Sequence, residues 1–154
     1  MPYEFLARSA AYPATVAEVL DAPVRVRFRR ATLRAVRRFA RSRPWHGDEA
    51  HRFEKFRRLN RDLALVYGIR RPLLMGERIG ARDEIVRGNG SYQPATHTIR
   101  LVGRLSVVTF LHEFGHALGF DERRTCRWSI NLFRRCFPRS FGSCRQVGHM
   151  LLRR

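Results

Sequence analysis

Apolar residues recur every three or four positions in two N-terminal stretches, which is the spacing of a helix with one buried face. Residues 30–42 place Leu33, Val36 and Phe39 on one side and arginines on the other. The second stretch carries Phe53, Phe56, Leu59, Leu63 and Val66. The pattern therefore predicts two amphipathic helices. Asp48 is expected to cap the second helix, and Gly68 is expected to end it.

A shorter alternation predicts β structure in the middle of the chain. Residues 96–103, "THTIRLVG", alternate with Ile99 and Leu101 on one face, and residues 72–75, "PLLM", form a short apolar strand candidate. Residues 24–29, "VRVRFR", alternate in the same way. In residues 88–96, "GNGSYQPAT", the Asn-Gly pair and the proline are typical of a turn.

Two further helices are predicted after residue 105. Ser106 stands at an N-cap position before the helical pattern of residues 107–118, and Gly119 is a natural C-terminal stop. Asp121 is expected to cap a last long helix over residues 122–136, closed by Pro138.

These elements predict one α+β domain over residues 1–154. It is expected to contain a basic N-terminal helical part and a small β-sheet, followed by two helices that carry the chemistry and a basic tail. The four parts cover residues 25–71, 72–104, 106–136 and 139–154.

The helix over residues 107–118 carries an unusual polar group, His112-Glu113-Phe-Gly-His116, within an otherwise apolar pattern. A separation of four residues places both imidazoles on one helix face, where they can bind one zinc ion. Glu113 is rotated by about 100° from His112, so it reaches a metal-bound water rather than the metal. This H-E-x-x-H arrangement predicts a zinc hydrolase with Glu113 as general base. The alternative interpretation is a pair of hydrogen-bonded core histidines.

A catalytic zinc site usually has a third protein ligand. Glu122 is the leading candidate, because Gly119 allows the chain to turn back before the last helix. A helix N-terminal acid without any metal role is the alternative for Glu122. Asp121 is the second candidate ligand and His149 the third.

The segment "THTIRLVG…TFLHEFGHALG" resembles the zincin peptidases, and the order of its parts is most similar to the small ImmA/IrrE-type gluzincins. That resemblance implies a zinc-dependent, intracellular peptidase that cleaves a protein or peptide substrate in a regulatory role. It assigns His112 and His116 as ligands and Glu113 as the base. The spacing to Glu122 is also similar to that of the metzincins, with Met150 as the candidate for their methionine turn.

Three other residues are candidates for stabilising an oxyanion: Tyr92, His97 and Arg100. The strand that begins at residue 96 is a candidate for pairing with a substrate backbone if its edge is free. A rival structural zinc site would use the cysteines at 126, 136 and 144 together with His149, although their spacing fits no known zinc knuckle.

The net charge of +18 changes the set of expected partners. Residues 25–71 carry 16 basic and 4 acidic groups, and residues 122–154 carry nine and one, whereas the segment between them is neutral. Such an excess attracts nucleic acid, acidic protein surfaces or anionic lipid, or else it is only a solvated arginine-rich surface. The alternative function is accordingly a nucleic-acid-associated protein on a zincin scaffold, either a DNA-linked protease that resembles the SprT family or an inactive binder.

No run of about 20 apolar residues is present, and the N-terminus lacks a basic start followed by an apolar block. We therefore expect a cytoplasmic protein without a membrane partner. The three cysteines are expected to be free thiols.

Overall fold

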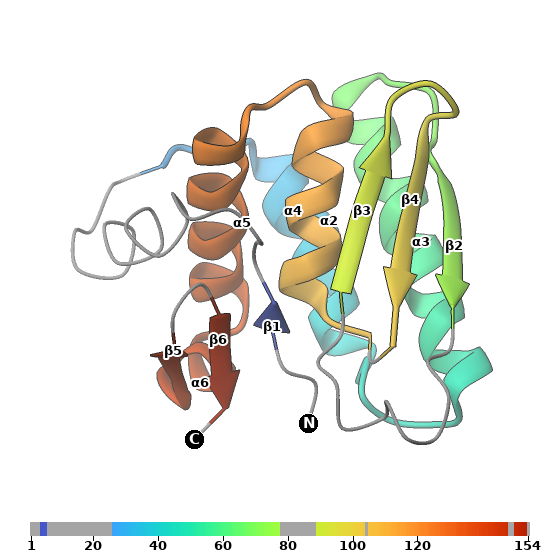
Figure 1. Cartoon of the computed structure of the whole chain (residues 1–154). Helices are drawn as coiled ribbons and strands as arrows, with labels where there is room; N and C mark the ends of the chain where they lie inside the picture. The colour runs from blue at the N-terminus through green and yellow to red at the C-terminus, as the bar shows by residue number, and fades with distance from the viewer. Residues whose placement is uncertain (1–3, 6–25, 78–88, 104, 148–149, 154) are drawn as a thin grey trace.

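The computed structural model describes residues 4–5, 26–77, 89–103, 105–147 and 150–153 (Figure 1). Its described part contains helices and two small β-sheets, which confirms the α+β class. The helices are α2 (Arg30–Arg41), α3 (Glu49–Tyr67), α4 (Val107–Ala117), α5 (Glu122–Cys136) and α6 (Pro138–Gly142).

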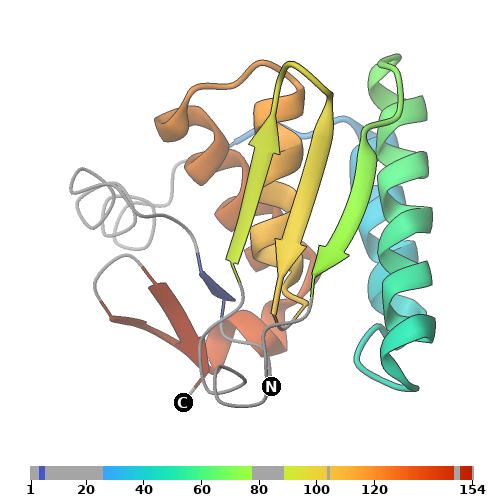
Figure 2. The same ribbon diagram turned by 45° about the vertical axis from the view of Figure 1, so that its right-hand side comes forward.

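The larger sheet has the order β2-β4-β3, from β2 (Leu73–Glu77), β4 (Thr98–Val102) and β3 (Asn89–Gln93). Strand β4 is parallel to β2 and antiparallel to β3, with Ile99 opposite both Leu74 and Tyr92. Helices α3 and α4 lie against one face of this sheet, and α2 lies behind them (Figures 1 and 2). The smaller sheet has the order β1-β6-β5, from β1 (Glu4–Phe5), β6 (Met150–Arg153) and β5 (Cys144–Val147).

The core lies between the larger sheet and the helices. Ile99 and Leu101 point from β4 into the core, while Phe110 and Phe114 point into it from α4, and all four side chains are buried. The rings of Phe56 and Phe110 meet edge-on, with 5.9 Å between their centroids. Because α4 is covered by apolar neighbours, the polar side chains in its middle are held in a largely dry environment.

The predicted caps are present. The side chains of Asp48, Ser106 and Asp121 each accept a hydrogen bond from a backbone N–H in the first turn of their helix. Gly68 follows α3 in the left-handed conformation, with φ of 64°. Local signals therefore fix the ends of these helices.

Three predictions about secondary structure differ from the structure. Residues 26–29 of the predicted strand over 24–29 have no regular structure, and residues 24–25 lie outside the described part. The predicted turn over residues 88–96 is too long: Asn89–Gln93 pairs along the whole of β4 as strand β3, and the turn itself lies at residues 94–97. The helix predicted over residues 122–136 is confirmed as α5, which ends before Pro138, but the segment predicted only as a basic tail contains the short helix α6 and strands β5 and β6.

Within the described residues, no helix has both the length and the apolar character that crossing a bilayer requires.

Candidate metal centre

His112 and His116 lie one turn apart on the buried helix α4, as their spacing predicts. Their ring centroids are 4.9 Å apart, and the ring planes meet at 82°. The side chain of His112 is 4 % exposed, whereas that of His116 is 21 % exposed. The pair therefore runs from the core toward the surface at the C-terminal end of α4.

Glu122 reaches both histidines because the chain reverses sharply after α4. Gly119 has φ of 89°, and the N–H groups of Gly119 and Phe120 donate to the carbonyls of His116 and Gly115. This is the glycine-closed helix end known as the Schellman motif. Helix α5 begins directly afterwards, so that Glu122 Oε2 lies 3.2 Å from His112 Nε2 and Glu122 Oε1 lies 2.9 Å from His116 Nε2.

A hydrogen bond from the ring of His116 to the backbone fixes the tautomer of that ring, and so determines whether the nitrogen next to Glu122 carries a proton. His116 Nδ1 lies 2.9 Å from the carbonyl oxygen of Phe120. A carbonyl oxygen only accepts hydrogen bonds, so Nδ1 carries the proton and, in the neutral ring, Nε2 presents its lone pair. In the neutral ring this lone pair and a carboxylate oxygen at 2.9 Å repel each other, so the contact is favourable with a metal ion between the two atoms or with a proton on Nε2.

The surroundings of His112 keep its ring neutral. Burial, with a smaller contribution from the neighbouring His116, lowers the pKa of His112 to about 3. An imidazolium at this position is therefore disfavoured, and His112 is available as a neutral nitrogen ligand. On its other side, Nδ1 of His112 lies 3.8 Å from the Sγ atom of Cys126.

Together, His112, His116 and Glu122 form a group that could hold a metal ion, called here the His–His–Glu group. One ligand atom from each of the three residues lies within 4.8 Å of the others. A tetrahedral ion with bonds of about 2.1 Å separates its ligand atoms by about 3.4 Å, close to the distances found here. Two neutral nitrogens and one carboxylate are donors that a divalent transition metal accepts. The group could therefore hold a divalent transition-metal ion.

Glu113 lies on the same helix but outside the His–His–Glu group. Its side chain is largely buried, and this burial raises the pKa of its carboxyl group to about 7. Strand β3 passes close to it, since a Cβ atom added to Gly90 would lie 3.2 Å from Glu113 Cγ and 2.6 Å from Thr109 Cγ2. A glycine at position 90 therefore lets the strand approach the helix beside a carboxyl group that gains or loses a proton near neutral pH.

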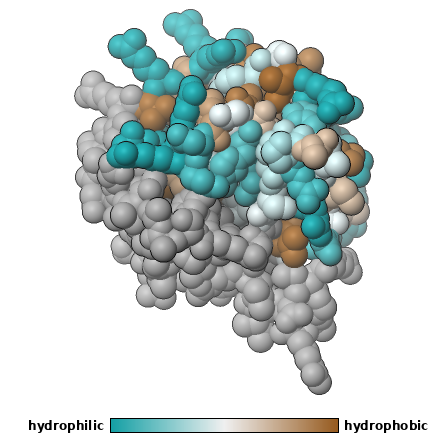
Figure 3. All heavy atoms as spheres, turned by 45° about the horizontal axis from the view of Figure 1, so that its top comes forward, coloured by the Kyte–Doolittle hydropathy of each residue, from teal (hydrophilic) through white to brown (hydrophobic). Residues whose placement is uncertain are grey.

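The outer end of the His–His–Glu group opens to the surface. The side chain of Glu122 is 55 % exposed, and partial burial raises the pKa of its carboxyl group. Figure 3 brings this end of the molecule forward and shows hydrophilic side chains with scattered hydrophobic ones between them. Solvent can therefore reach the ligand atoms from the side of Glu122.

Helices α4 and α5 cross very closely behind the two histidines. The hydroxyl group of Thr125 donates a hydrogen bond of 2.6 Å to the carbonyl oxygen of His112. A Cβ atom on Gly115 would lie 1.9 Å from Thr125 Oγ1, so only glycine fits at this position. The crossing fixes Glu122, one turn before Thr125, in front of the histidines.

Other residues predicted for the site have different roles or lie outside the described part. Asp121 is the N-cap of α5 and does not belong to the metal-binding group. The hydroxyl group of Tyr92 lies 2.7 Å from His97 Nδ1, and Arg100 forms an ion pair with Glu77. Residue 149, the third candidate ligand, falls outside the described residues.

The rival cysteine site is not formed by the described residues. Their only cluster of three or more metal-binding side chains is the His–His–Glu group, so the three cysteines do not converge. Cys126 lies beside His112, and the thiol of Cys144 donates to the carbonyl oxygen of Ser140. Burial, and then the nearby Glu122 and Glu113, raises the pKa of Cys126 to about 12, which keeps it a neutral thiol.

The sequence interpretation missed three contacts that position the ligands: the carbonyl group of Phe120, the hydroxyl group of Thr125 and the close approach at Gly115. Every residue has a backbone carbonyl group, so the sequence does not show which one accepts a hydrogen bond from a histidine. The glycine inside the H-E-x-x-H motif is a sequence signal for close helix packing. Glycine lowers the stability of a helix, so its presence in the middle of one suggests that a larger side chain would not fit there.

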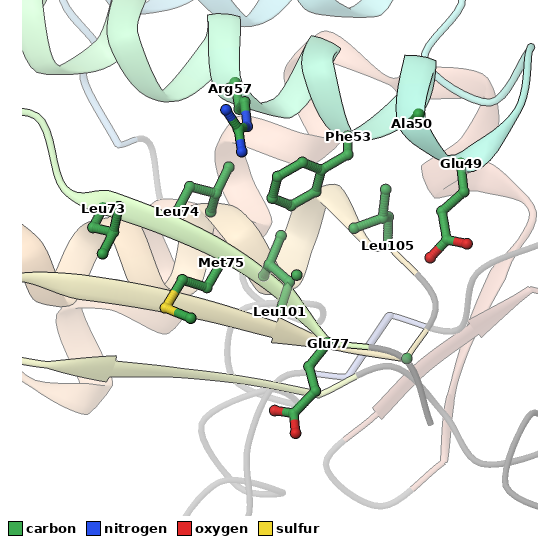
Figure 4. Close-up of a pocket in the computed structure, with 12 residues that line it drawn as sticks. Glu49, Ala50, Phe53, Arg57, Leu73, Leu74, Met75, Glu77, Leu101 and Leu105 are labelled. Atoms are coloured by element: carbon green, nitrogen blue, oxygen red, sulfur yellow. The ribbon is translucent and has the colours of Figure 1, made fainter. Parts of the chain in front are cut away.

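A separate cavity of about 610 Å³ lies between α3 and β2 (Figure 4). Phe53, Leu74 and Leu101 form part of its apolar lining, and the charged residues Glu49, Arg57 and Glu77 also line it. It contains none of the residues of the His–His–Glu group, so it forms no part of the candidate metal centre.

Compared with protein-family models, curated proteins and solved structures, the chain matches none of them. The functional interpretation therefore depends on the geometry of the site.

Proposed function

We propose that the protein is a zinc-dependent peptidase, with the His–His–Glu group as its metal ligands and Glu113 as its general base. The observation that carries this proposal is the convergence of His112 Nε2 and His116 Nε2 on the carboxylate of Glu122, at 3.2 and 2.9 Å. When bound, zinc would supply Lewis acidity toward a carbonyl oxygen and lower the pKa of water.

The chain's own residues provide the proton transfer. Glu113 follows His112 directly, and its carboxyl group has a pKa of about 7 because it is buried. A general base works best when its pKa is close to the operating pH. Glu113 takes a proton from the attacking water and then delivers it to the leaving amine.

Strand β3 is suited to hold an extended peptide next to this carboxyl group. It is the outer strand of its sheet on the side of α4, and among the described strands it pairs only with β4. An outer strand can bind a peptide backbone by adding it to the sheet. The strand over residues 96–103 is a candidate for this pairing only if its edge is free, and that condition is not met, because β4 is the central strand and both of its edges are paired.

The test compares the wild-type protein with Glu113→Gln and His116→Ala. Zinc content is measured in each purified protein, and hydrolysis is followed with a library of quenched fluorescent peptides. We expect about one zinc per chain in the wild type and in Glu113→Gln, and little in His116→Ala. Hydrolysis is expected to fall by about 10²- to 10⁴-fold in Glu113→Gln, because only the proton transfer is lost.

Two results would contradict the proposal. Equal zinc content in the wild type and in His116→Ala would show that the metal binds elsewhere. Unchanged hydrolysis in Glu113→Gln at unchanged zinc content would exclude Glu113 as the base.

A further inference from the structure

Helix α2 exposes a continuous row of arginines, called here the arginine face: Arg30, Arg34, Arg37, Arg38 and Arg41. All five residues are exposed, and no other residue of α2 is. The opposite side of the helix, which includes Leu33, Val36 and Phe39, is buried in the core. Helix α2 therefore packs against the core on one side, and the fully exposed residues of its other side are all arginines.

Most of this charge is not compensated. Arg38 lies 3.4 Å from Asp62, which Arg61 also contacts. The structure gives no ion pair between the other four arginines and any acidic group of the described residues. Helix stability explains only part of the row: Arg38 and Arg41 lie in the last turn, where a cation favours the helix dipole, whereas Arg30 begins the helix and its first turn contains no acidic residue. A cation at that end opposes the helix dipole.

The basic surface continues onto the C-terminal end of α5. Helices α2 and α5 contact each other, and Arg135 in the last turn of α5 is exposed. Arg139, in α6, is also exposed.

We infer that the arginine face of α2 binds the phosphate backbone of nucleic acid. Successive arginines are three or four residues apart, so at 1.5 Å per residue they advance by about 5 Å along the helix and span about 16 Å in total. A row of this length can contact several phosphates. Guanidinium groups bind phosphate oxygens in a bidentate manner, which favours arginine over lysine in this role.

An anionic membrane surface and an acidic protein surface fit this face less well than nucleic acid does. Helices that bind a membrane surface insert apolar side chains, but the apolar side of α2 is buried in the core. Stable protein interfaces usually have aromatic or other apolar anchors at their centre, and the exposed residues of α2 include none. A surface that consists of charge alone is typical of sequence-independent phosphate binding.

The experiment measures binding of a fluorescently labelled DNA duplex by the full chain as a function of salt concentration. The variant is Arg34→Gln/Arg37→Gln, and the matched control is Arg70→Gln/Arg71→Gln, which removes the same charge from exposed arginines outside α2. Each lost phosphate contact lowers the slope of log affinity against log salt by about 0.9. The α2 variant should therefore lose about 2 from this slope, and its affinity at about 0.1 M salt should fall by about 10- to 100-fold.

The control should keep a slope close to that of the wild type. Equal losses in the two variants would overturn the inference, because the protein would then act as a diffuse positive charge. Tighter binding to vesicles of equal parts phosphatidylcholine and phosphatidylserine than to DNA would also overturn it. Zinc content, measured in the same samples, reports separately on folding and on the proposed peptidase site.

Discussion

Glu113 follows His112 directly on α4, yet the pKa values of the two side chains shift in opposite directions. Burial disfavours the charged form of each, which is the deprotonated form of Glu113 and the protonated form of His112. Burial raises the pKa of Glu113 to about 7 and lowers that of His112 to about 3. The folded protein therefore holds a proton on Glu113 over a pH range in which an unfolded chain has released it.

This difference predicts how the stability of the metal-free protein depends on pH. Between about pH 4.5 and 7 the folded state binds more protons at Glu113 than the unfolded state does, so its contribution to stability falls as the pH rises. The free energy of unfolding of the wild type, relative to that of Glu113→Gln, is expected to fall by up to about 3 kcal/mol over this range. Urea unfolding in EDTA at several pH values measures the difference.

The comparison with Glu113→Gln is needed because His112 changes the free energy of unfolding with pH in the direction opposite to that of Glu113. Its lowered pKa makes stability rise with pH between about 3 and 6.5, and both proteins share this contribution. A difference between the two proteins that does not change with pH would show that Glu113 titrates as an exposed carboxyl group.

At the scale of the elements, the crossing of α4 and α5 decides whether the metal ligands meet. Gly115→Ala would place a Cβ atom 1.9 Å from Thr125 Oγ1, so the two helices must move apart. We expect this substitution to lower the free energy of unfolding by about 1–3 kcal/mol. It should also weaken zinc binding, because Glu122 moves with α5.

Gly142→Ala is the matched control, since a Cβ atom there meets nothing within 4 Å. It should leave zinc affinity unchanged and leave stability equal or slightly higher. Denaturant unfolding and a competitive zinc titration measure both effects. Wild-type zinc affinity in Gly115→Ala would show that the close crossing does not position Glu122.

At the scale of the whole molecule, a bound metal would join two helices that are otherwise held by packing and by the hydrogen bond from Thr125 to His112. The ligands come from α4 and α5, so an ion bound only by the folded state adds to its stability. Zinc at about 1,000 times its dissociation constant adds about 4 kcal/mol. This corresponds to a rise in Tm of about 10 °C for a protein of this size.

Removal of zinc with EDTA should therefore lower the Tm of the wild type by this amount, and re-addition should restore it. His116→Ala should show almost no response to EDTA, because its ligand set is incomplete. A Tm of the wild type that does not respond to EDTA would contradict a metal bound at the interface of these helices. Differential scanning calorimetry is the measurement.

The sequence by itself determined the helices, their caps and the pair of histidines on one helix face. These features depend on contacts within a few residues, such as the Asp121 cap and the four-residue spacing of His112 and His116. Local hydrogen bonds and helical periodicity are readable from residue identity alone.

Only the tertiary structure decided the rest. It brings Glu122 rather than Asp121 to the histidines, makes Asn89–Gln93 an outer strand, and places β4 at the centre of the sheet. Each outcome depends on partners distant in sequence, as when Gly90 fits against α4. Strand pairing and helix crossing are set by packing between separate segments, and the local pattern of a segment does not specify its partner.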